Sequence, residues 1–369
     1  MIPLSNPFIS NAFSYQILVP IAMFWATISK PIINCSQQLG FSQIPSHTDF
    51  YDDLDGKIAI ITGANTGVGK QTATHLAAMG AHVILACRSM EKGEIAAKEI
   101  LQKIKATQSD SSSSSKMSVK AMQLDLSDLD SVRAFSAEFC AAHPRLDILV
   151  NNAGTNDKAG PPTKQGHGHC FGINFLGPFL LTNLLLEKMK QTEAATRIVN
   201  LSSVMHHFAE GDFEQSIKPT FYKDSYRDSK LAMLLFTLAL NRHLRDTRVT
   251  AVAVNPGAVN SDIWRHAKQK RQGIKGAILT RLEQFLYLNS EQGAATSVYG
   301  AVGNLSRACT THGYYLAPYM VPSFLGGLRV AFEMLGPFAG PKFVIPSLPE
   351  NEKQKSEALW KLCEQLTGQ

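Results

Sequence analysis

Residues 62–69 read TGANTGVG and stand between an apolar run of strand length and a helical pattern. In a strand–turn–helix unit of this kind, glycines bring the backbone close to a pyrophosphate, which then faces the helix N-terminus. We assign the tight turn to Gly63, the approach to the pyrophosphate to Gly67, and the close packing of helix on sheet to Gly69. A glycine-rich turn alone is weak evidence for a nucleotide site, so the assignment depends on the sequence around the turn.

Apolar runs of strand length alternate with helix-length stretches on the C-terminal side of this turn. The predicted strands are residues 57–62, 81–87, 119–124, 146–151, 197–201 and 249–255. Continuous Val/Ile/Leu strands separated by helices are typical of a parallel sheet with both faces covered. We therefore predict a single α/β domain at residues 54–320, with a doubly wound (Rossmann) parallel sheet and helices on both faces.

The composition agrees with a folded protein of this class. The chain has 369 residues, of which 44% are hydrophobic and 18% charged, and its net charge is +6. These values exclude a disordered chain, and the positive charge is too diffuse to indicate nucleic acid. Even the closest cysteines, Cys140 and Cys170, are too far apart for a CxxC pair, so we predict no metal site and a reducing compartment.

The N-terminal 34 residues are apolar, and no charged residue occurs between Ile2 and Ser29. A membrane-spanning helix needs about 20 apolar residues, and the apolar centre at residues 17–28 reaches that length only when residues 8–15 are included. We predict that residues 1–34 are a membrane anchor and residues 35–53 a linker; a packed arm and a targeting peptide are the alternatives. Lys30 follows the run, so for an anchor the positive-inside rule places the folded domain on the cytosolic side. The expected membrane is the endoplasmic reticulum or a similar one.

Residues 321–369 are predicted to form an apolar and then helical C-terminal extension. Between Tyr319 and Pro346 the charged residues are Arg329, Glu333 and Lys342. Such a stretch would cover a substrate cleft or touch a membrane, and packing on the core is an alternative of equal weight.

The end of the second predicted strand indicates which dinucleotide would bind. A site for NAD places a carboxylate there for the ribose 2′-hydroxyl, but this chain has Cys87. Arg88 would instead pair with a 2′-phosphate, supported by Lys92, although an arginine on the solvated surface is the alternative. NADP(H) is therefore the favoured cofactor.

Tyr226 and Lys230 begin a predicted helix and lie one turn apart on the same face. A nearby ammonium lowers the pKa of a phenol, and the positive charge of an oxidised nicotinamide acts the same way. The tyrosine could then exchange protons near neutral pH. YxxxK is common by chance, so its value depends on the motifs around it.

Several polar motifs accompany this pair. Ser202 and Ser203 stand at a strand end, where a hydroxyl could hold a substrate oxygen. Asn174 interrupts an apolar helix, an unfavourable place for asparagine unless its side chain is hydrogen-bonded. The NNAG stretch at residues 151–154 follows the fourth strand, where ligands bind in such sheets. Asp125 closes the third strand.

Together these motifs resemble the short-chain dehydrogenase/reductase family, whose glycine-rich turn has the same TGxxxGxG spacing. The finer resemblance is to its retinol dehydrogenase-like and WW-domain oxidoreductase-like branch. It is carried by LACRS at residues 85–89, YRDSKLA at 226–232 and EQGAAT at 291–296. The resemblance runs from about Leu54 to Ala317.

The resemblance implies a catalytic set and a cofactor site. Tyr226 would be the general acid/base, and Lys230 would lower its pKa and hold the nicotinamide ribose. Ser203, rather than Ser202, would polarise the substrate oxygen, and Asn174 would support a water-linked proton path. The residues implied to bind the cofactor are Gly63, Asn65, Thr66, Gly67, Val68, Gly69, Arg88, Lys92, Asp125, Asn151, Ala153, Gly154, Tyr226, Lys230, Pro256, Gly257 and Val259.

The implied reaction is hydride transfer between NADP(H) and a carbonyl or alcohol carbon, with reduction as the expected direction. The apolar ends of the chain favour a lipophilic substrate such as a retinoid, a sterol or an aldehyde. If the chain forms an oligomer, we expect a homodimer. A catalytically idle NADP-binding regulatory or interaction protein and a tetrapyrrole-type reductase are the alternatives. The intact Tyr/Lys/Ser/Asn set argues against the first, and the NNAG motif argues mildly against the second.

Two segments depart from the family pattern. Residues 205–225 form an insertion that we predict to fold over the substrate cleft, with a surface excursion as the alternative. Residues 164–170 read KQGHGHC, which we interpret as a surface turn leading into a helix rather than as a metal site.

Overall fold

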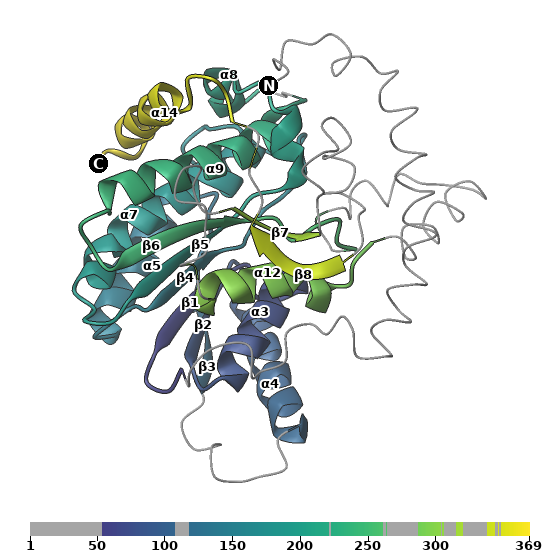
Figure 1. Ribbon diagram of the computed structural model, residues 1–369. Helices are drawn as coiled ribbons and strands as arrows, with labels where there is room; N and C mark the ends of the chain where they lie inside the picture. The colour runs from purple at the N-terminus through teal and green to yellow at the C-terminus, as the bar shows by residue number, and fades with distance from the viewer. Residues whose placement is uncertain are drawn as a thin grey trace.

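The computed structural model describes residues 54–107, 118–220, 223–260, 263, 287–303, 305, 315–319, 338–343, 346 and 348–369. An eight-stranded sheet with the order β3-β2-β1-β4-β5-β6-β7-β8 lies at its centre (Figure 1). The strands are β1 (Ile58–Thr62), β2 (His82–Cys87), β3 (Ser118–Gln123), β4 (Ile148–Asn151), β5 (Thr196–Leu201), β6 (Val249–Val254), β7 (Tyr315–Tyr319) and β8 (Phe338–Phe343). The predicted anchor and linker lie outside the described residues. Residues 109–115, a serine-rich stretch that we interpret as a surface loop, also lie outside them.

The predicted doubly wound parallel sheet is confirmed. Strands β1 to β7 pair in parallel, and β8 pairs antiparallel with β7. Strand β1 lies between β2 and β4, so the chain order reverses there, and ligands of such sheets bind at the carboxyl ends of the strands beside this point. β8 adds a strand beyond the predicted domain end at residue 320.

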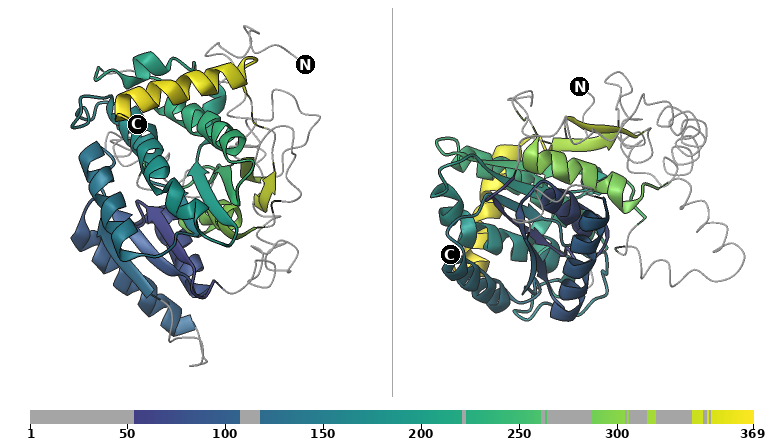
Figure 2. Two further views of the ribbon diagram at one scale, coloured as in Figure 1. Left: turned by 90° about the vertical axis from the view of Figure 1, so that its left-hand side faces the viewer. Right: turned by 90° about the horizontal axis from the view of Figure 1, so that it is seen from below.

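Helices cover both faces of the sheet (Figures 1 and 2). The helices of one face are α3 (Gly67–Ala78), α4 (Met90–Thr107) and α12 (Ser290–Val302). Those of the other are α5 (Leu129–Ala142), α7 (Gly177–Lys190), α9 (Ser225–His243) and, packed outside α9, α14 (Glu352–Thr367). The short elements are α6 (His169–Phe171), the π-helix η1 (Gly172–Leu176), the 3-10 helix η2 (Val204–Phe208) and α8 (Phe213–Ile217).

The strands place successive side chains in two separate cores. Ile60 packs in the core under α5, α7 and α9, and the next residue, Ile61, packs in the core under α3, α4 and α12. Both are fully buried, and burying an isoleucine contributes about 1.5–3 kcal/mol. This two-sided burial explains why the strands are continuously apolar instead of alternating.

The helix predicted within the C-terminal extension is present as α14. The Trp360 indole packs against Phe179 of α7 and Phe236 of α9, with ring centroids 5.3 and 5.5 Å apart. This contact favours core packing for that part of the extension.

Among the described residues, one helical stretch is long and apolar enough to cross a membrane, His169–Lys190. It comprises α6, η1 and α7, and 72% of its most apolar window is buried inside the fold. It is therefore a core helix.

Candidate active site

The predicted catalytic residues meet between the carboxyl ends of β4 and β5 and the first turns of α9. Lys230 Nζ lies 5.6 Å from the centre of the Tyr226 ring and donates a hydrogen bond to the carbonyl oxygen of Leu201 at 3.0 Å. A Cβ placed on Gly154 would lie 3.6 Å from Lys230 Nζ and 3.3 Å from Asn174 Oδ1. Residues far apart in sequence thus form one cluster, and their catalytic roles stay predictions.

Burial dominates the electrostatics of the Tyr/Lys pair. It raises the pKa of Tyr226 to about 12, although a hydrogen bond with Ser203 acts in the opposite direction. It also lowers the pKa of Lys230 to about 8. The direction for Tyr226 is opposite to that expected from the YxxxK spacing, because desolvation of the phenolate outweighs the other interactions at this buried position.

The two serines after β5 have different partners. Ser203 caps η2, accepts a hydrogen bond from the backbone N–H of Met205 at 3.2 Å, and contacts the Tyr226 hydroxyl. Ser202 is 2% exposed and donates to the carbonyl oxygen of Lys230 at 2.8 Å, which ties β5 to α9. The geometry favours Ser203 as the residue that would reach a substrate oxygen.

Asn174 lies in the π-helix η1, where the sequence pattern predicts a regular helix. Its Nδ2 donates to the carbonyl oxygen of Thr155 at 2.9 Å and to Ser229 Oγ at 3.0 Å, and its Oδ1 accepts from Thr155 N–H at 2.7 Å. Ser229 Oγ donates in turn to the carbonyl oxygen of Tyr226 at 2.7 Å. Neither Thr155 nor Ser229 was predicted as a site residue. The position of Ser229 directly before Lys230 could have indicated a role for it.

The glycine-rich turn has the backbone geometry that an anion site needs. Gly63 and Gly67 have φ angles of +65° and +59°, a left-handed conformation that favours glycine. A Cβ on Gly63 would lie 3.0 Å from Ala153, and one on Gly69 would lie 2.3 Å from Asn152 Nδ2. Thr66 precedes α3 in an extended conformation, and the first turn of α3 holds no acidic residue. The N–H groups of the first turn of a helix point out of its N-terminal end, and here they therefore fit a pyrophosphate.

The two asparagines of the NNAG motif have different roles, which the sequence alone did not distinguish. Asn152, missed as a site residue, donates through Nδ2 to the carbonyl oxygen of Thr62 at 2.8 Å, and its N–H donates to Thr62 Oγ1 at 3.0 Å. Asn151 is 1% exposed and donates to Thr182 Oγ1 and Asn200 Oδ1, at 3.0 and 2.8 Å. Asn152 thus holds the glycine-rich turn, whereas the Asn151 side chain belongs to the core.

Arg88 and Lys92 are both exposed, Arg88 just after β2 and Lys92 in the first turn of α4. Cys87 is buried, which raises the pKa of its thiol to about 11, while hydrogen bonds from the backbone of Ala64 and Asn65 act in the opposite direction. These contacts place the Cys87 thiol against the glycine-rich turn. The two cations follow at the surface beside it.

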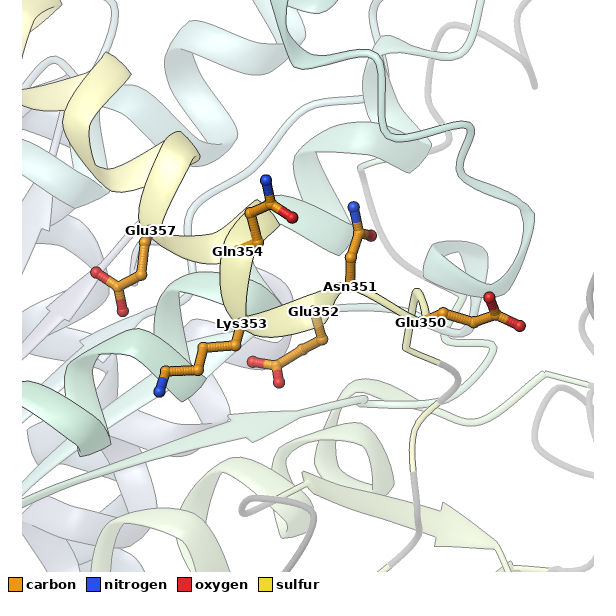
Figure 3. Close-up of a pocket in the computed structure, with 6 residues that line it drawn as sticks. All are labelled: Glu350, Asn351, Glu352, Lys353, Gln354 and Glu357. Carbon is orange, nitrogen blue, oxygen red and sulfur yellow. The ribbon is translucent and has the colours of Figure 1, made fainter.

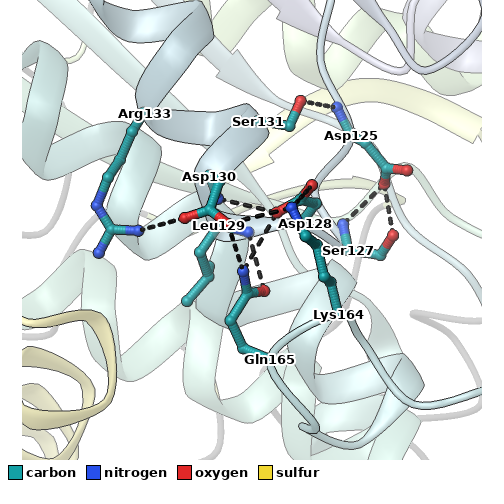
Figure 4. A network of polar contacts seen from close by, with 9 residues as sticks. All are labelled: Asp125, Ser127, Asp128, Leu129, Asp130, Ser131, Arg133, Lys164 and Gln165. Carbon is teal, nitrogen blue, oxygen red and sulfur yellow. Dashed lines mark hydrogen bonds and ion pairs between the residues drawn. The ribbon is translucent and has the colours of Figure 1, made fainter.

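Asp125 closes β3 within a network of polar contacts (Figure 4). Its Oδ1 accepts from the N–H and the hydroxyl of Ser127, at 2.9 and 2.6 Å. Beside it, Lys164 forms an ion pair with Asp128 at 2.9 Å. The network fastens the loop after β3 to the segment that precedes α6.

That segment has the predicted conformation. Gly166 has a φ angle of +81° and donates to the carbonyl oxygen of Thr163 at 2.8 Å, and α6 begins at His169. The turn leading into a helix is therefore confirmed. Within the part of the chain that the structure describes, no group of three His, Cys, Asp or Glu side chains could hold a metal ion.

The loop after β6 meets the start of α3. Gly257 has a φ angle of +84° and donates to Asn255 Oδ1 at 2.9 Å. A Cβ on Gly293 of α12 would lie 2.6 Å from Val259 Cγ2 and 3.2 Å from Val68 Cγ2. Val259 and Val68 thus lie close together, as expected of two residues that are predicted to bind the same cofactor.

The insertion packs against the fold in its described part, residues 205–220 and 223–225. The Phe213 ring lies 6.1 Å from that of Phe171 in α6, and Gly168 N–H donates to the carbonyl oxygen of Ile217 at 2.8 Å. This excludes a surface excursion without contact. Phe221 and Tyr222 lie outside the described residues, and closure over a substrate cleft stays a prediction.

A hollow on the outer helix α14 is lined by Glu350, Asn351, Glu352, Lys353, Gln354 and Glu357 (Figure 3). None of them is a predicted site residue. Arg242 of α9 forms ion pairs with Glu352 at 2.8 Å and with Glu357 at 3.3 Å. This acidic surface therefore has a structural role in docking α14.

Comparisons with known proteins match the same region of the chain. A family model for short chain dehydrogenases matches residues 57–272. The chain is 42% identical to retinol dehydrogenase 11 of Homo sapiens over 251 residues, 68% of this chain and 74% of the relative. It is 43% identical to retinol dehydrogenase 12 of Mus musculus, with the same two shares.

Solved structures give the same fold. An uncharacterized protein from Mycobacterium paratuberculosis has a TM-score of 0.60 and 28% identity, covering 87% of this chain and 96% of that one. L-sorbose reductase from Gluconobacter frateurii, complexed with NADPH and L-sorbose, has a TM-score of 0.53 and 20% identity, covering 68% and 93%. At 20% identity the second likeness shows the fold alone.

Proposed function

This chain belongs to the short-chain dehydrogenase family and is an oxidoreductase acting on alcohol or carbonyl groups, and we propose that it is an NADP(H)-dependent reductase of a lipophilic carbonyl compound. The cluster of Tyr226, Lys230 and Ser203 carries this proposal. Gly154 beside Lys230 and Ala153 beside Gly63 connect the cluster to the glycine-rich turn. Bound NADPH would supply the hydride from its nicotinamide. The chain's own residues would hold the substrate oxygen and give it a proton.

Tyr226 would be the proton donor. Its pKa is raised to about 12 by burial, so the phenol stays protonated at neutral pH, as a general acid for carbonyl reduction requires. Ser203 would donate a hydrogen bond to the same substrate oxygen as negative charge develops on it. Lys230 would hold the ribose and pass a replacement proton toward Tyr226.

Lys230 sets an expected pH dependence. Because its pKa is lowered to about 8, the folded protein loses this charge above that pH, whereas a lysine at its ordinary pKa keeps it. We expect kcat/KM for carbonyl reduction to fall as the pH rises through about 8, measured from pH 6 to 10 at constant ionic strength. A profile that stays level through this window would contradict a role for the Lys230 ammonium.

Arg88 is the residue that supports NADP(H) over NAD(H). A guanidinium–phosphate contact contributes about 1.5–3 kcal/mol, which corresponds to about 10- to 150-fold in affinity. Arg88→Ala should therefore raise the Kd for NADPH by about that factor and leave the Kd for NADH within about twofold, measured by quenching of protein fluorescence. Arg245→Ala, which removes an exposed arginine paired with Asp246, is the control. Equal weakening of both cofactors would refute 2′-phosphate recognition by Arg88.

The substrate class and the location form the finer part of the proposal. Relatives that carry the name retinol dehydrogenase support a retinoid, and the apolar residues 1–34 support anchoring at a membrane with the folded domain facing the cytosol. A panel of retinoid, sterol and long-chain carbonyl compounds with NADPH or NADH, followed at the nicotinamide absorbance band, tests both cofactor and substrate. Oxidation of neither cofactor with any compound would favour the idle regulatory protein instead.

A further inference from the structure

A buried aspartate in α9 has no part in the mechanism above. Asp228 stands between Tyr226 and Lys230 in sequence, and the helical repeat places it on the opposite face of α9 from both. An outward-facing carboxylate on a helix of this layer would normally meet water. Asp228 is nevertheless 0% exposed.

The insertion is what covers this carboxylate. Gly211 N–H donates to Asp228 Oδ1 at 2.8 Å, and the Ser216 hydroxyl donates to Asp228 Oδ2 at 2.9 Å. Gly211 has a φ angle of +73°, and a Cβ there would lie 2.5 Å from Lys355 Nζ and 3.4 Å from Leu231 Cδ2. The backbone therefore turns in a left-handed conformation that favours glycine, and both carboxylate oxygens of Asp228 accept a hydrogen bond.

The donors to this carboxylate are neutral groups. Among the described residues, no ion pair includes Asp228. Burial and the neighbouring carboxyl groups of Asp224 and Glu210 raise the pKa of Asp228. A buried carboxylate among like charges is costly unless its hydrogen bonds are complete. The two bonds to residues 211–217 are therefore what keeps this group in place.

The same segment is fastened to the helix that carries Asn174. Gly168 N–H donates to the carbonyl oxygen of Ile217, and a Cβ on Gly168 would lie 2.5 Å from the carbonyl oxygen of Ser216. Phe213 packs on Phe171 in α6, the turn that leads into η1. Residues 211–217 thus lie between two elements that each hold predicted catalytic residues.

We infer that Asp228 is a positioning residue: it fastens residues 211–217 to α9, and this segment joins α9 to α6 and η1. We call this segment of the insertion a brace, because it would fix the position of the Tyr/Lys pair relative to Asn174. The inference rests on the proposed function for its catalytic consequence, while the bracing itself is a property of the fold.

Two substitutions at Asp228 and one elsewhere test the inference in the full chain. Asp228→Ala leaves Gly211 N–H and the Ser216 hydroxyl without their acceptor, and the expected result is a fall in kcat of about 10- to 100-fold with KM for NADPH within about twofold. Asp228→Asn keeps an acceptor for Gly211 and offers an N–H group to Ser216, so it should restore most of kcat.

Asp147→Ala is the control for loss of a buried carboxylate away from the site. Asp147 is 1% exposed, accepts from Ile58 N–H at 2.9 Å and forms an ion pair with Arg145. It lies at the amino ends of β1 and β4, the end of the strands opposite the site. Its loss should lower Tm while kcat stays near that of the wild type. If Asp228→Ala changes kcat no more than Asp147→Ala does, or if Asp228→Asn fails to restore it, the positioning role is refuted.

Hydrogen exchange separates this inference from the proposed function. Asp228→Ala should speed amide exchange at residues 211–217 and in the first turns of α9 and α6, without reference to any substrate. Wild-type protection at residues 225–230 in this variant would overturn the bracing role. If exchange changes as expected but the wild type reduces no carbonyl compound, the proposed function fails and the brace stands.

Discussion

Tyr226→Phe should abolish carbonyl reduction while NADPH still binds. The substitution removes one hydroxyl, which contacts Ser203; Tyr226 is 6% exposed. Loss of a positioned general acid costs about 10²- to 10⁴-fold in kcat. The ring remains to fill its space, so the fold and the cofactor site should be kept. Single-turnover oxidation of NADPH gives the rate, and fluorescence titration gives the affinity.

A second tyrosine provides the control for this experiment. Tyr299 lies half-buried on α12, on the other face of the sheet, and Tyr299→Phe should leave kcat unchanged. Reduction by Tyr226→Phe at a rate near that of the wild type would show that the proton comes from another group. Loss of NADPH binding in the same variant would instead assign Tyr226 to the cofactor site alone.

The fold was predictable from sequence because the buried parallel strands are short and continuously apolar. All six predicted strands are present, each within two residues of its predicted ends. Strands β7 and β8 were not predicted. Both sequences, YLAPY and FAGPKF, contain proline, and the second also contains glycine; both residues weaken a strand pattern. Strand β8 is the edge of the sheet, and the register between β7 and β8 shifts between Ala317 and Tyr319; edges and such irregularities tolerate proline.

The parts of the candidate site that were predictable are those in which one short motif places its functional residues at fixed positions on the backbone. The TGANTGVG turn and the Tyr/Lys pair are of this kind. The roles of Asn151, Asn152 and Asp228 were not predictable, because each depends on a partner at least twelve positions away in sequence. Nor was the raised pKa of Tyr226, which depends on the degree of burial and not on the spacing to Lys230.

Lys230→Met should lower kcat by at least about 10²-fold and also weaken NADPH binding, by about tenfold. Methionine keeps the apolar length of the side chain but removes the ammonium that donates to the carbonyl oxygen of Leu201. Unlike Tyr226→Phe, this variant is expected to change both constants, because the ammonium would serve the ribose and the proton path together. Its effect on kcat/KM should be largest below pH 8, where the wild-type ammonium is charged.

Lys188→Met makes the same change in a comparable bond away from the site. Lys188 Nζ donates to the carbonyl oxygen of Cys140 at 3.2 Å and joins α7 to α5. Both variants lose one lysine–carbonyl hydrogen bond, so a purely structural effect would lower Tm in both and leave kcat alike. A fall in kcat confined to Lys230→Met assigns the ammonium to the reaction, whereas equal kcat values would reduce Lys230 to a tether between β5 and α9.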